Sequence, residues 1–322
     1  MLTLVSVVHR HDAPLLRLQA RSIAAHLATR DVAAILVAIN DSDEAGVRAR
    51  IDPVLDAYGP HRAAVQVLGG DALLGQEAAG LRGWRSRGLY RLPGFRRGGW
   101  RGNNGYRMQQ AMKLAVARVA PSERIVLLDA KNAFLRPPGA YDFFDVEGRP
   151  QTVFIPVKAG HHRSWLAQSL EVLGVDIDLA DIPETTIYTT PFAVTRTILR
   201  AVLAEAEKRA GPVDCLFASR KRPSEFMLIN AWAMMQPGGL RAVFAPDAPP
   251  RAGFWPDGGL PEFEHALREI ERPEALTAGV HHRGLGMLPP GSIERLAQAL
   301  ASRGLGDADE IGGLLRAVVS GS

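Results

Sequence analysis

The segment Ile125–Pro137 places an acid, a base and an amide directly after a short apolar run. Ile125–Leu128 predicts a buried strand, since four consecutive apolar residues suit a sheet that is covered on both faces. Asp129, Lys131 and Asn132 then stand where this strand leaves the sheet. Ligands of open α/β sheets bind just outside the carboxyl ends of the strands. We therefore expect these three side chains at a ligand site.

Two further polar groups add to the chemistry that the sequence offers. Glu225 follows the basic run 220–222, and His281 and His282 precede Arg283. A phosphorylated substrate requires positive charge to neutralise it and an acid or base to move a proton. Carboxylate, imidazole and cation recur here at strand ends and at the start of a helix. This combination favours a phosphorylated substrate.

Alternating strand-like and helix-like segments would position these groups. Apolar runs predict strands at 2–8, 33–39, 64–68, 125–128, 152–157 and 242–245, with a strand-to-loop segment at 278–284; helical spacing predicts helices at 13–28, 47–58, 106–119, 195–210, 293–300 and 309–319, and another beginning near 223. Asp12 and Ser224 are suited to cap the helices that follow them. The strand–helix–strand order of the first half indicates a parallel, doubly wound sheet.

Residues 80–105 are rich in glycine and arginine and are long for a loop, so we expect a functional or mobile loop there. The arginines of this part of the chain are Arg82, Arg85, Arg87, Arg91, Arg96, Arg97, Arg101 and Arg107. Two interpretations of this charge stay open: a solvated basic loop, or a surface that meets phosphate or a membrane. Nucleic acid is not expected as a partner, because no nucleic-acid-binding motif accompanies the charge.

The composition is that of an ordinary soluble globular protein. Of the 322 residues, 47% are hydrophobic and 22% are charged, and the net charge is +4. Cys215 is the one cysteine, which excludes an intramolecular disulfide and a zinc–thiolate site. The sequence opens directly on a strand at Met1 without a signal-peptide pattern. We therefore expect a cytoplasmic protein, and peripheral contact with the inner face of the membrane stays open.

Several familiar catalytic motifs are absent from the sequence. It has no G-x-x-x-x-G-K-[ST] loop, which argues against a P-loop NTPase. His9 and its neighbours follow the first strand, where a dinucleotide-binding dehydrogenase would have G-x-G-x-x-G. No G-x-S-x-G motif marks a hydrolase serine. The polar groups at 129–132, 225 and 281–283 are therefore the candidates for a site.

The order of four segments resembles the GT-A fold of nucleotide-sugar glycosyltransferases, and more specifically a bacterial family of glycosyltransferase-like proteins. The segments are Tyr106–Ala115, Val126–Pro137, Pro223–Leu228 and Val280–Arg283, and the resemblance spans about residues 1–285. It implies an α/β fold with a Rossmann-like, mixed and mainly parallel sheet flanked by helices. It also implies a GT-A-like domain at 1–285 and a C-terminal helical extension at 286–322, packed on that domain.

In typical enzymes of the GT-A fold, this strand ends in an Asp-x-Asp motif that holds a divalent metal on the donor diphosphate, and a later histidine often completes the metal shell. By this resemblance, Asp129 matches the first acid and His281 or His282 the histidine, which implies Mn²⁺ or Mg²⁺ as a cofactor. Lys131 departs from the pattern, because it stands in place of the second acid. A protonated lysine cannot bind a metal, but it can offer its charge to the diphosphate directly. Asn132 retains a carbonyl oxygen for a hard cation.

The resemblance also implies roles for residues outside this segment. Glu225 would remove a proton from the acceptor hydroxyl as it attacks the sugar. His9 and Asp41, at the ends of the first two strands, would lie near the nucleotide base and ribose. Side chains of the helix before the central strand would contact sugar hydroxyls or phosphate: Arg107, Gln109, Gln110 and Lys113. Helical spacing places Gln109 and Lys113 on one face.

The sequence therefore predicts a hexosyltransferase-like enzyme of polysaccharide biosynthesis. It would transfer a sugar from a nucleotide-diphosphate donor to a carbohydrate or lipid-linked acceptor of the cell envelope, with Asp129, Lys131 and Glu225 in the catalytic roles. Two alternatives stay open. One is a non-catalytic nucleotide-sugar-binding protein, which the lysine at position 131 suggests. The other is a metal-dependent phosphohydrolase built on the histidines.

Overall fold

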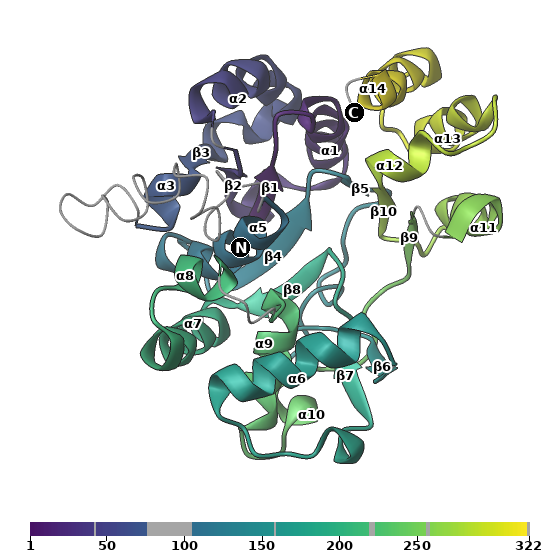
Figure 1. Ribbon diagram of the computed structural model, residues 1–322. Helices are drawn as coiled ribbons and strands as arrows, with labels where there is room; N and C mark the ends of the chain where they lie inside the picture. Colours follow the sequence, from purple (N-terminus) through teal and green to yellow (C-terminus); the bar gives the residue numbers. More distant parts are fainter. Residues whose placement is uncertain (42, 76–104, 158, 219–222, 256–257, 321–322) are drawn as a thin grey trace, which may run out of the picture.

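The computed structural model describes residues 1–41, 43–75, 105–157, 159–218, 223–255 and 258–320 (Figure 1). Within these residues the central sheet consists of β1 (Leu2–Val8), β2 (Val32–Ile39), β3 (Val65–Gly69), β4 (Arg124–Asp129) and β8 (Phe192–Thr195). Their order across the sheet is β3-β2-β1-β4-β8. The first four pair in parallel, and β8 joins β4 antiparallel. The predicted mixed, mainly parallel sheet is confirmed.

Helices cover both faces of this sheet. One face carries α1 (Ala13–His26), α2 (Glu44–Ile51) and the 3-10 segment η2 (Asp52–Ala64). The core on the other face includes residues of α3 (Gly70–Leu73), α5 (Gly105–Ala115), α6 (His161–Leu173), α7 (Arg196–Ala210), α8 (Val213–Ala218), α9 (Glu225–Met234) and α10 (Leu240–Val243). Alternate residues of β2 belong to opposite cores, with Ile35 and Val37 in the first and Leu36 and Ala38 in the second. Burial on both faces explains why the strands are continuous apolar runs.

Two smaller sheets lie beside the central one. The first joins β5 (Asn132–Phe134), β10 (Thr277–Val280) and β9 (Arg251–Phe254), and the second pairs β6 (Phe154–Pro156) with β7 (Glu184–Thr186). The strand β10 pairs antiparallel with β5 and parallel with β9. Because β5 begins three residues after Asp129, this sheet brings the later part of the chain next to the end of β4.

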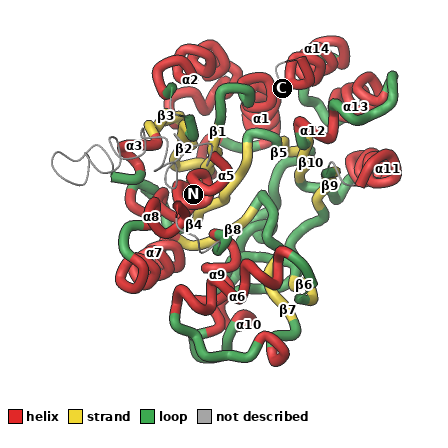
Figure 2. The backbone as a smooth tube through the Cα atoms, in the orientation of Figure 1, coloured by secondary structure: helices red, strands yellow, loops and turns green. Residues whose placement is uncertain are grey.

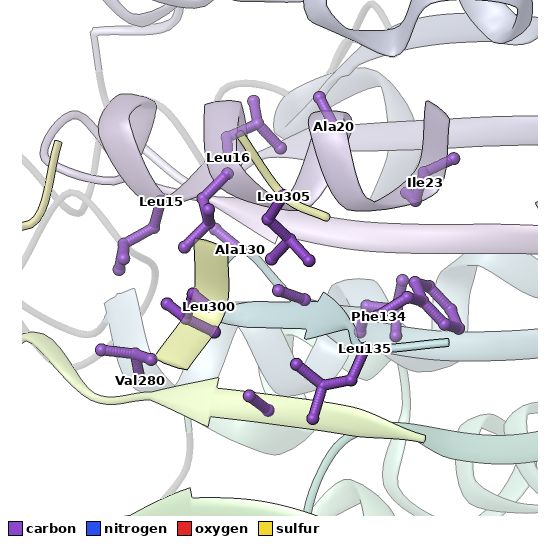
Figure 3. Packing of buried hydrophobic residues seen from close by; sticks show 14 of the residues in the cluster. Leu15, Leu16, Ala20, Ile23, Ala130, Phe134, Leu135, Val280, Leu300 and Leu305 are labelled. Carbon is purple, nitrogen blue, oxygen red and sulfur yellow. The ribbon is translucent and has the colours of Figure 1, made fainter. Parts of the chain in front are cut away.

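The helix α1 joins the central sheet to this smaller sheet. Figure 3 shows its apolar side chains above β5 and β10: Leu15, Leu16, Ala20 and Ile23 lie near Phe134, Leu135, Val280, Leu300 and Leu305. Hydrogen bonds involving side chains of α1 also fix its position against β1 and β5. Ser6 Oγ donates to Gln19 Oε1 at 2.6 Å, and Phe134 N donates to Ser22 Oγ at 2.9 Å. The end of β4 is therefore held on a rigid base.

The C-terminal helices gather beside α1 (Figure 2). They are α11 (Gly259–Glu271), α12 (His282–Leu285), α13 (Ser292–Ala301) and α14 (Ala308–Ser320). The helix α14 contacts both α1 and α12, and α13 contacts α11. The division of the chain at residue 285 stays a prediction. Among the helices of the described ranges, none combines the length and the apolar composition that a membrane span needs.

Some predicted elements are wrong in type or extent. Residues 242–245 are not a strand, because α10 begins after Gly238 and Gly239, whose φ angles are 81° and 63°. The predicted helix 47–58 ends earlier, as α2 gives way to the η2 segment that contains Pro60 and a non-helical Gly59. The elements additional to the predicted set include α6, α11, β8 and β9. The predicted loop at 80–105 lies, except for Gly105, outside the described residues, as does the basic run 220–222.

The two predicted helix caps have different outcomes. The Ser224 hydroxyl accepts from Met227 N, so the cap of α9 is confirmed. Asp12 precedes α1 but its side chain does not cap it. With φ of −88° and ψ of −6°, Asp12 has a helical backbone rather than the extended one of a capping residue. Its carboxylate accepts from His9 N at 2.7 Å instead.

Candidate active site

A cleft of about 780 Å³ lies at the carboxyl ends of the parallel strands. Residues at the ends of β1, β2 and β4 form its floor, among them His9, Asn40 and Asp129. The start of α5, the start of α9 and the β10–α12 connection form parts of its wall. The cleft is therefore where an α/β sheet is expected to bind a ligand.

The backbone at the end of β4 is fixed by two buried amides. Asp129 N donates to Asn132 Oδ1 at 2.8 Å, which closes the turn between β4 and β5. Gln19 Nε2 donates to the carbonyl oxygens of Asp129 and Asn132, at 2.8 and 3.0 Å. Asn132 is buried and is not among the residues that line the cleft. Its side-chain oxygen therefore serves the turn, and the structure does not offer it to a cation.

The Asp129 carboxylate lies between two ammonium groups. Lys113 Nζ lies 2.8 Å from Oδ1, and Lys131 Nζ lies 3.2 Å from Oδ2. The Thr190 hydroxyl also donates to Oδ2, at 2.9 Å. Burial alone would raise the pKa of Asp129, but the two lysines lower it by more than burial raises it, so this pKa lies well below its ordinary value. Asp129 is therefore an anion at physiological pH.

Lys113 connects Asp129 to Glu225. Its side chain is only 2% exposed, and its Nζ lies 3.3 Å from Glu225 Oε1. Burial opposes its charge, yet the two carboxylates raise the pKa of Lys113 above its ordinary value. The ammonium group also lies 5.3 Å from the centre of the Phe226 ring. Lys113 is therefore a fixed buried cation between two acids.

Glu225 is the first residue of α9 and lines the cleft. Its side chain is 5% exposed. Burial raises the pKa of Glu225, with Lys113 acting against this shift and Asp129 adding to it. A carboxylate with a raised pKa at the edge of a cleft is suited to take up a proton.

Lys131 stands on the opposite side of Asp129 from Lys113, next to aromatic rings. Its Nζ lies 4.1 Å from the centre of the Trp255 ring. The His281 ring lies 5.5 Å from Trp255 and stacks on His282 at 4.7 Å. Burial and then the charge of Lys131 lower the pKa of His281 to about 4. Both histidines line the cleft, and His281 is neutral at physiological pH.

The residues present do not fit the divalent metal that the sequence resemblance implies. In the described ranges, no three His, Cys, Asp or Glu side chains gather to hold a metal ion. Both carboxylate oxygens of Asp129 already contact ammonium groups, and Lys131 brings a positive charge to the place where a dication would lie. Bringing a second cation there would cost electrostatic energy in a partly desolvated site.

The predicted nucleotide contacts divide into two sets. His9 lines the cleft, but Asp41 is buried behind it and is not a lining residue. Arg10 donates to both oxygens of Asp41, at 2.7 and 2.5 Å, and His9 Nε2 lies 3.1 Å from Oδ2. Burial alone would raise the pKa of Asp41, but the Arg10 hydrogen bond contributes to a net lowering. Asp41 therefore holds its neighbours in place.

The helix α5 also presents only part of the predicted set. Gln109 and Lys113 both line the cleft, as their spacing predicts. Gln110 is buried, and its Nε2 donates to Tyr106 O at 3.3 Å. Arg107 is half-buried and is not among the lining residues.

The sequence gives little signal for three lining residues that matter. Trp255 comes from a Pro/Gly-rich segment, which predicts only an exposed surface. Thr190 reaches Asp129 from the chain before β8, far away in sequence. Asp12 lines the cleft as well. Burial, with the charge of Asp129 adding to it, raises the pKa of Asp12 to about 6.

Comparison with known proteins places the chain in a family. A family model described as "Family of unknown function (DUF6492)" matches residues 14–248. The chain belongs to this family. Four residues of the central cluster lie in the DUF6492 region, namely Lys113, Asp129, Lys131 and Glu225. Trp255, His281 and His282 lie beyond it, so the wall on the Lys131 side comes from outside the DUF6492 match. No curated protein matches this DUF6492 chain in sequence.

Solved structures similar to this DUF6492 protein include a galactosyltransferase and a xylosyltransferase. Galactosyltransferase LgtC, in complex with donor and acceptor sugar analogs, is 10% identical, with a TM-score of 0.44 over 93% of this chain and 95% of that chain. An active-site mutant of LgtC has a TM-score of 0.45 at the same identity and coverage. Mouse xyloside xylosyltransferase 1 in its apo form is 12% identical, with a TM-score of 0.35 over 82% of this chain and 92% of that chain. Likeness at this level carries no inference about substrates, so the function has to be argued from the cleft itself.

Proposed function

We propose that this protein is a glycosyltransferase that moves a sugar from a nucleotide-diphosphate donor to a carbohydrate or lipid-linked acceptor of the cell envelope. The observation that carries the proposal is the cluster of Lys113, Asp129, Lys131 and Glu225 at the carboxyl end of β4. It combines cations for an anionic leaving group with a buried carboxylate that can accept a proton.

In the proposed reaction, the acceptor hydroxyl oxygen attacks the anomeric carbon of the donor sugar. A new carbon–oxygen bond forms, and the bond from the anomeric carbon to the diphosphate breaks. The hydroxyl proton passes to Glu225, and the bonding electrons leave with the nucleoside diphosphate. Lys131 would stabilise the negative charge that develops on this leaving group. Lys113 would hold Glu225 and Asp129 in place from the buried side of the cluster.

Aromatic residues support a carbohydrate as the second substrate. Trp165 and Tyr188 line the cleft, and both are partly exposed. Tyr188 is held by its stack on His162, with ring centres 3.9 Å apart. Sites for small molecules commonly combine aromatic walls with a few polar groups that fix orientation. A cytoplasmic location at the inner face of the membrane belongs to this proposal, and cell fractionation would test it.

Replacing Glu225 by glutamine tests the proposal directly. The chain is first screened by thermal shift with UDP- and GDP-sugars, and turnover with mono- and oligosaccharide acceptors is read as released UDP or GDP. Loss of a general base lowers rates by about 100- to 10,000-fold. We expect Glu225→Gln to lose turnover on this scale and to keep the dissociation constant for the donor within about twofold of wild type.

A matched control separates this role from a general effect of lost charge. Glu294 also lies in the first turn of a helix, α13, and is exposed, in a pair with Arg316 at 3.0 Å. The variant Glu294→Gln should keep full turnover. Full turnover in Glu225→Gln would remove Glu225 from the mechanism. A wild-type protein that is neither stabilised by any sugar nucleotide nor releases UDP or GDP from one would refute the proposed donor.

The second candidate is a non-catalytic nucleotide-sugar-binding protein. The observation that favours it is the 3.3 Å contact between Glu225 and Lys113, because an acid held in an ion pair is a weaker base. Stabilisation by a sugar nucleotide with no turnover on any acceptor would support this candidate over the transferase. The third interpretation, a metal-dependent phosphohydrolase, has no observation in its favour in the described residues.

A further inference from the structure

We propose that Lys131 is the resident cation of this cleft, and that its ammonium group binds the diphosphate of the nucleotide in place of a divalent metal. The inference rests on the proposed function, since it concerns the donor of that reaction. It goes further by naming the group that neutralises the diphosphate and by making donor binding independent of metal.

The position of the Lys131 ammonium is fixed from two sides. Asp129 Oδ2 lies 3.2 Å from Nζ, and the Trp255 ring centre lies 4.1 Å from it on another side. The Lys131 side chain is 15% exposed, so it is packed although it lines the cleft. A charge that is held in place before the ligand arrives loses little conformational freedom on binding. Lys131 is therefore already ordered as a diphosphate-binding group.

The ammonium group of Lys131 has hydrogen-bonding capacity to spare. It carries three N–H donors. Within the described ranges, Asp129 is the only carboxylate that lies within 4.0 Å of Nζ. Asp129 in turn is shared with Lys113, whose buried Nζ lies 2.8 Å from Oδ1. At least one N–H of Lys131 is then free for a phosphate oxygen in the cleft, where charge-assisted hydrogen bonds are short and strong.

The surroundings favour an anion over a metal beside Lys131. Arg283 lines the same cleft and adds a second positive charge. Asp12 opposes these charges, with a pKa raised to about 6. A diphosphate meets two cations here, whereas a dication would have to displace at least one ammonium group from Asp129.

Isothermal titration calorimetry of the full chain tests the proposal. UDP, GDP and inorganic pyrophosphate are titrated in EDTA, and the two nucleotides also in Mn²⁺. For the nucleotide that binds, we expect dissociation constants in EDTA and in Mn²⁺ that agree within about twofold. Loss of a hydrogen bond to a charged group weakens binding by about 10- to 100-fold, and we expect this loss in Lys131→Met under both conditions. Lys131→Arg should recover most of the affinity.

Lys208 provides the matched control. It lies on α7, its side chain is 77% exposed, and it is not among the residues that line the cleft. Lys208→Met lowers the net charge of the protein by one, as Lys131→Met does. We expect the Lys208→Met variant to bind the nucleotide as wild type does. Equal weakening in both variants would mean that Lys131 acts only through the overall charge, and would overturn the proposal.

The variant Lys131→Asp should reverse the metal dependence of nucleotide binding. It removes the ammonium group and adds a carboxylate beside Asp129 and His281, which is a set of groups that suits a hard divalent cation. We expect this variant to lose nucleotide binding in EDTA by at least about 10-fold and to regain part of it in Mn²⁺. Wild-type binding that vanishes in EDTA and returns with Mn²⁺ would overturn the proposal.

Failure of this inference can be told apart from failure of the proposed function. Pyrophosphate that binds through Lys131 in EDTA, while no nucleotide binds, would refute the sugar-nucleotide donor and leave the diphosphate role of Lys131 standing. Nucleotide binding and turnover that require Mn²⁺ would refute the role of Lys131 and leave the transferase standing. No binding of any of the three probes would refute both.

Discussion

Two carboxylates at the ends of parallel strands, Asp129 at the end of β4 and Asp41 after β2, hold their cations in different ways. Both have pKa values below the ordinary one, because neighbouring cations outweigh burial. The main partner of Asp129 is Lys113, whose side chain is 2% exposed. The main partner of Asp41 is Arg10, whose side chain is 43% exposed. The Asp41 carboxylate is more buried than that of Asp129, at 1% against 20% exposed, so the difference between the two pairs lies in the solvation of their cations.

This difference distinguishes a ligand-binding cluster at Asp129 from a structural ion pair at Asp41. At Asp129 the charges are enclosed by protein, so they are fixed in position and interact strongly. At Asp41 the guanidinium is half in water, and the pair ties the turn between β1 and α1 to the end of β2. Water screens such a pair and weakens it. A ligand in the cleft therefore meets fixed charge at Asp129, while Asp41 supports the frame around it.

Replacing Lys113 by methionine disrupts the buried cluster at Asp129 and has the largest expected effect on stability. The variant keeps an unbranched side chain, one atom shorter, but leaves Asp129 and Glu225 without the ammonium group between them. Removing one partner of a buried ion pair costs about 3 to 5 kcal/mol, since it leaves an uncompensated buried charge. We expect the free energy of unfolding to fall by this amount, measured by urea denaturation at pH 7.

Two further variants qualify this result. Lys208→Met removes an exposed lysine that lies 4.0 Å from Glu205, and it should cost less than about 1 kcal/mol. Adding Glu225→Gln to Lys113→Met should restore part of the loss, because it removes one of the two unpaired acids. A cost below about 1 kcal/mol for Lys113→Met itself would mean that the enclosed cluster is no stronger than the exposed pair.

The central sheet and the floor of the cleft could be predicted from the sequence for a definite reason. Strands buried on both faces are continuous apolar runs, so β1 was predicted with its observed bounds, Leu2–Val8. Polar residues at the ends of such runs stand out by contrast, as Asp129 does. Helical spacing was enough to place Gln109 and Lys113 together on the cleft.

The wall beside Lys131 could not be predicted, because it depends on contacts between distant segments. The strand β9 exists through its pairing with β10, and Trp255 follows it in a Pro/Gly-rich stretch with no strand pattern of its own. Thr190 reaches Asp129 across 61 positions. The misplaced cap at Asp12 has a local cause, since residue type predicts a cap but the backbone conformation decides whether it forms.

Asp12 links the two regions, because it interacts with residues near Asp41 and with the cluster at Asp129. Its carboxylate accepts from the backbone of His9, a contact of Asp41, and its pKa responds to the charges of Asp129 and Lys131. Burial raises the pKa of Asp12 from 3.8 to about 6. The folded state then holds the proton more tightly, so wild-type stability is highest below about pH 4 with respect to this group and falls as the pH rises through 6.

The variant Asp12→Asn removes this titration and keeps an oxygen for His9 N. We expect it to be more stable than wild type by about 1 to 2 kcal/mol at pH 8, a discounted value because Asp12 lines the open cleft. The advantage should shrink as the pH falls from 8 to 4.5, measured by urea denaturation at each pH. An advantage that stays constant over this range would show that the effect is not the titration of Asp12.

Replacing Arg10 by methionine tests the partly solvated ion pair at Asp41, and the expected effect on stability is the smallest. Asp41 keeps two partners, since Asp43 N donates to Oδ1 at 3.0 Å and His9 Nε2 lies 3.1 Å from Oδ2. An ion pair with a half-exposed cation contributes about 1 kcal/mol or less, and salt screens it. We expect a loss of that size at low salt and a smaller one in 1 M NaCl, whereas the loss in Lys113→Met should change little with salt. If both losses respond to salt equally, the enclosure of the Asp129 cluster is not what sets it apart, and its fixed charge could not serve a ligand in the way proposed.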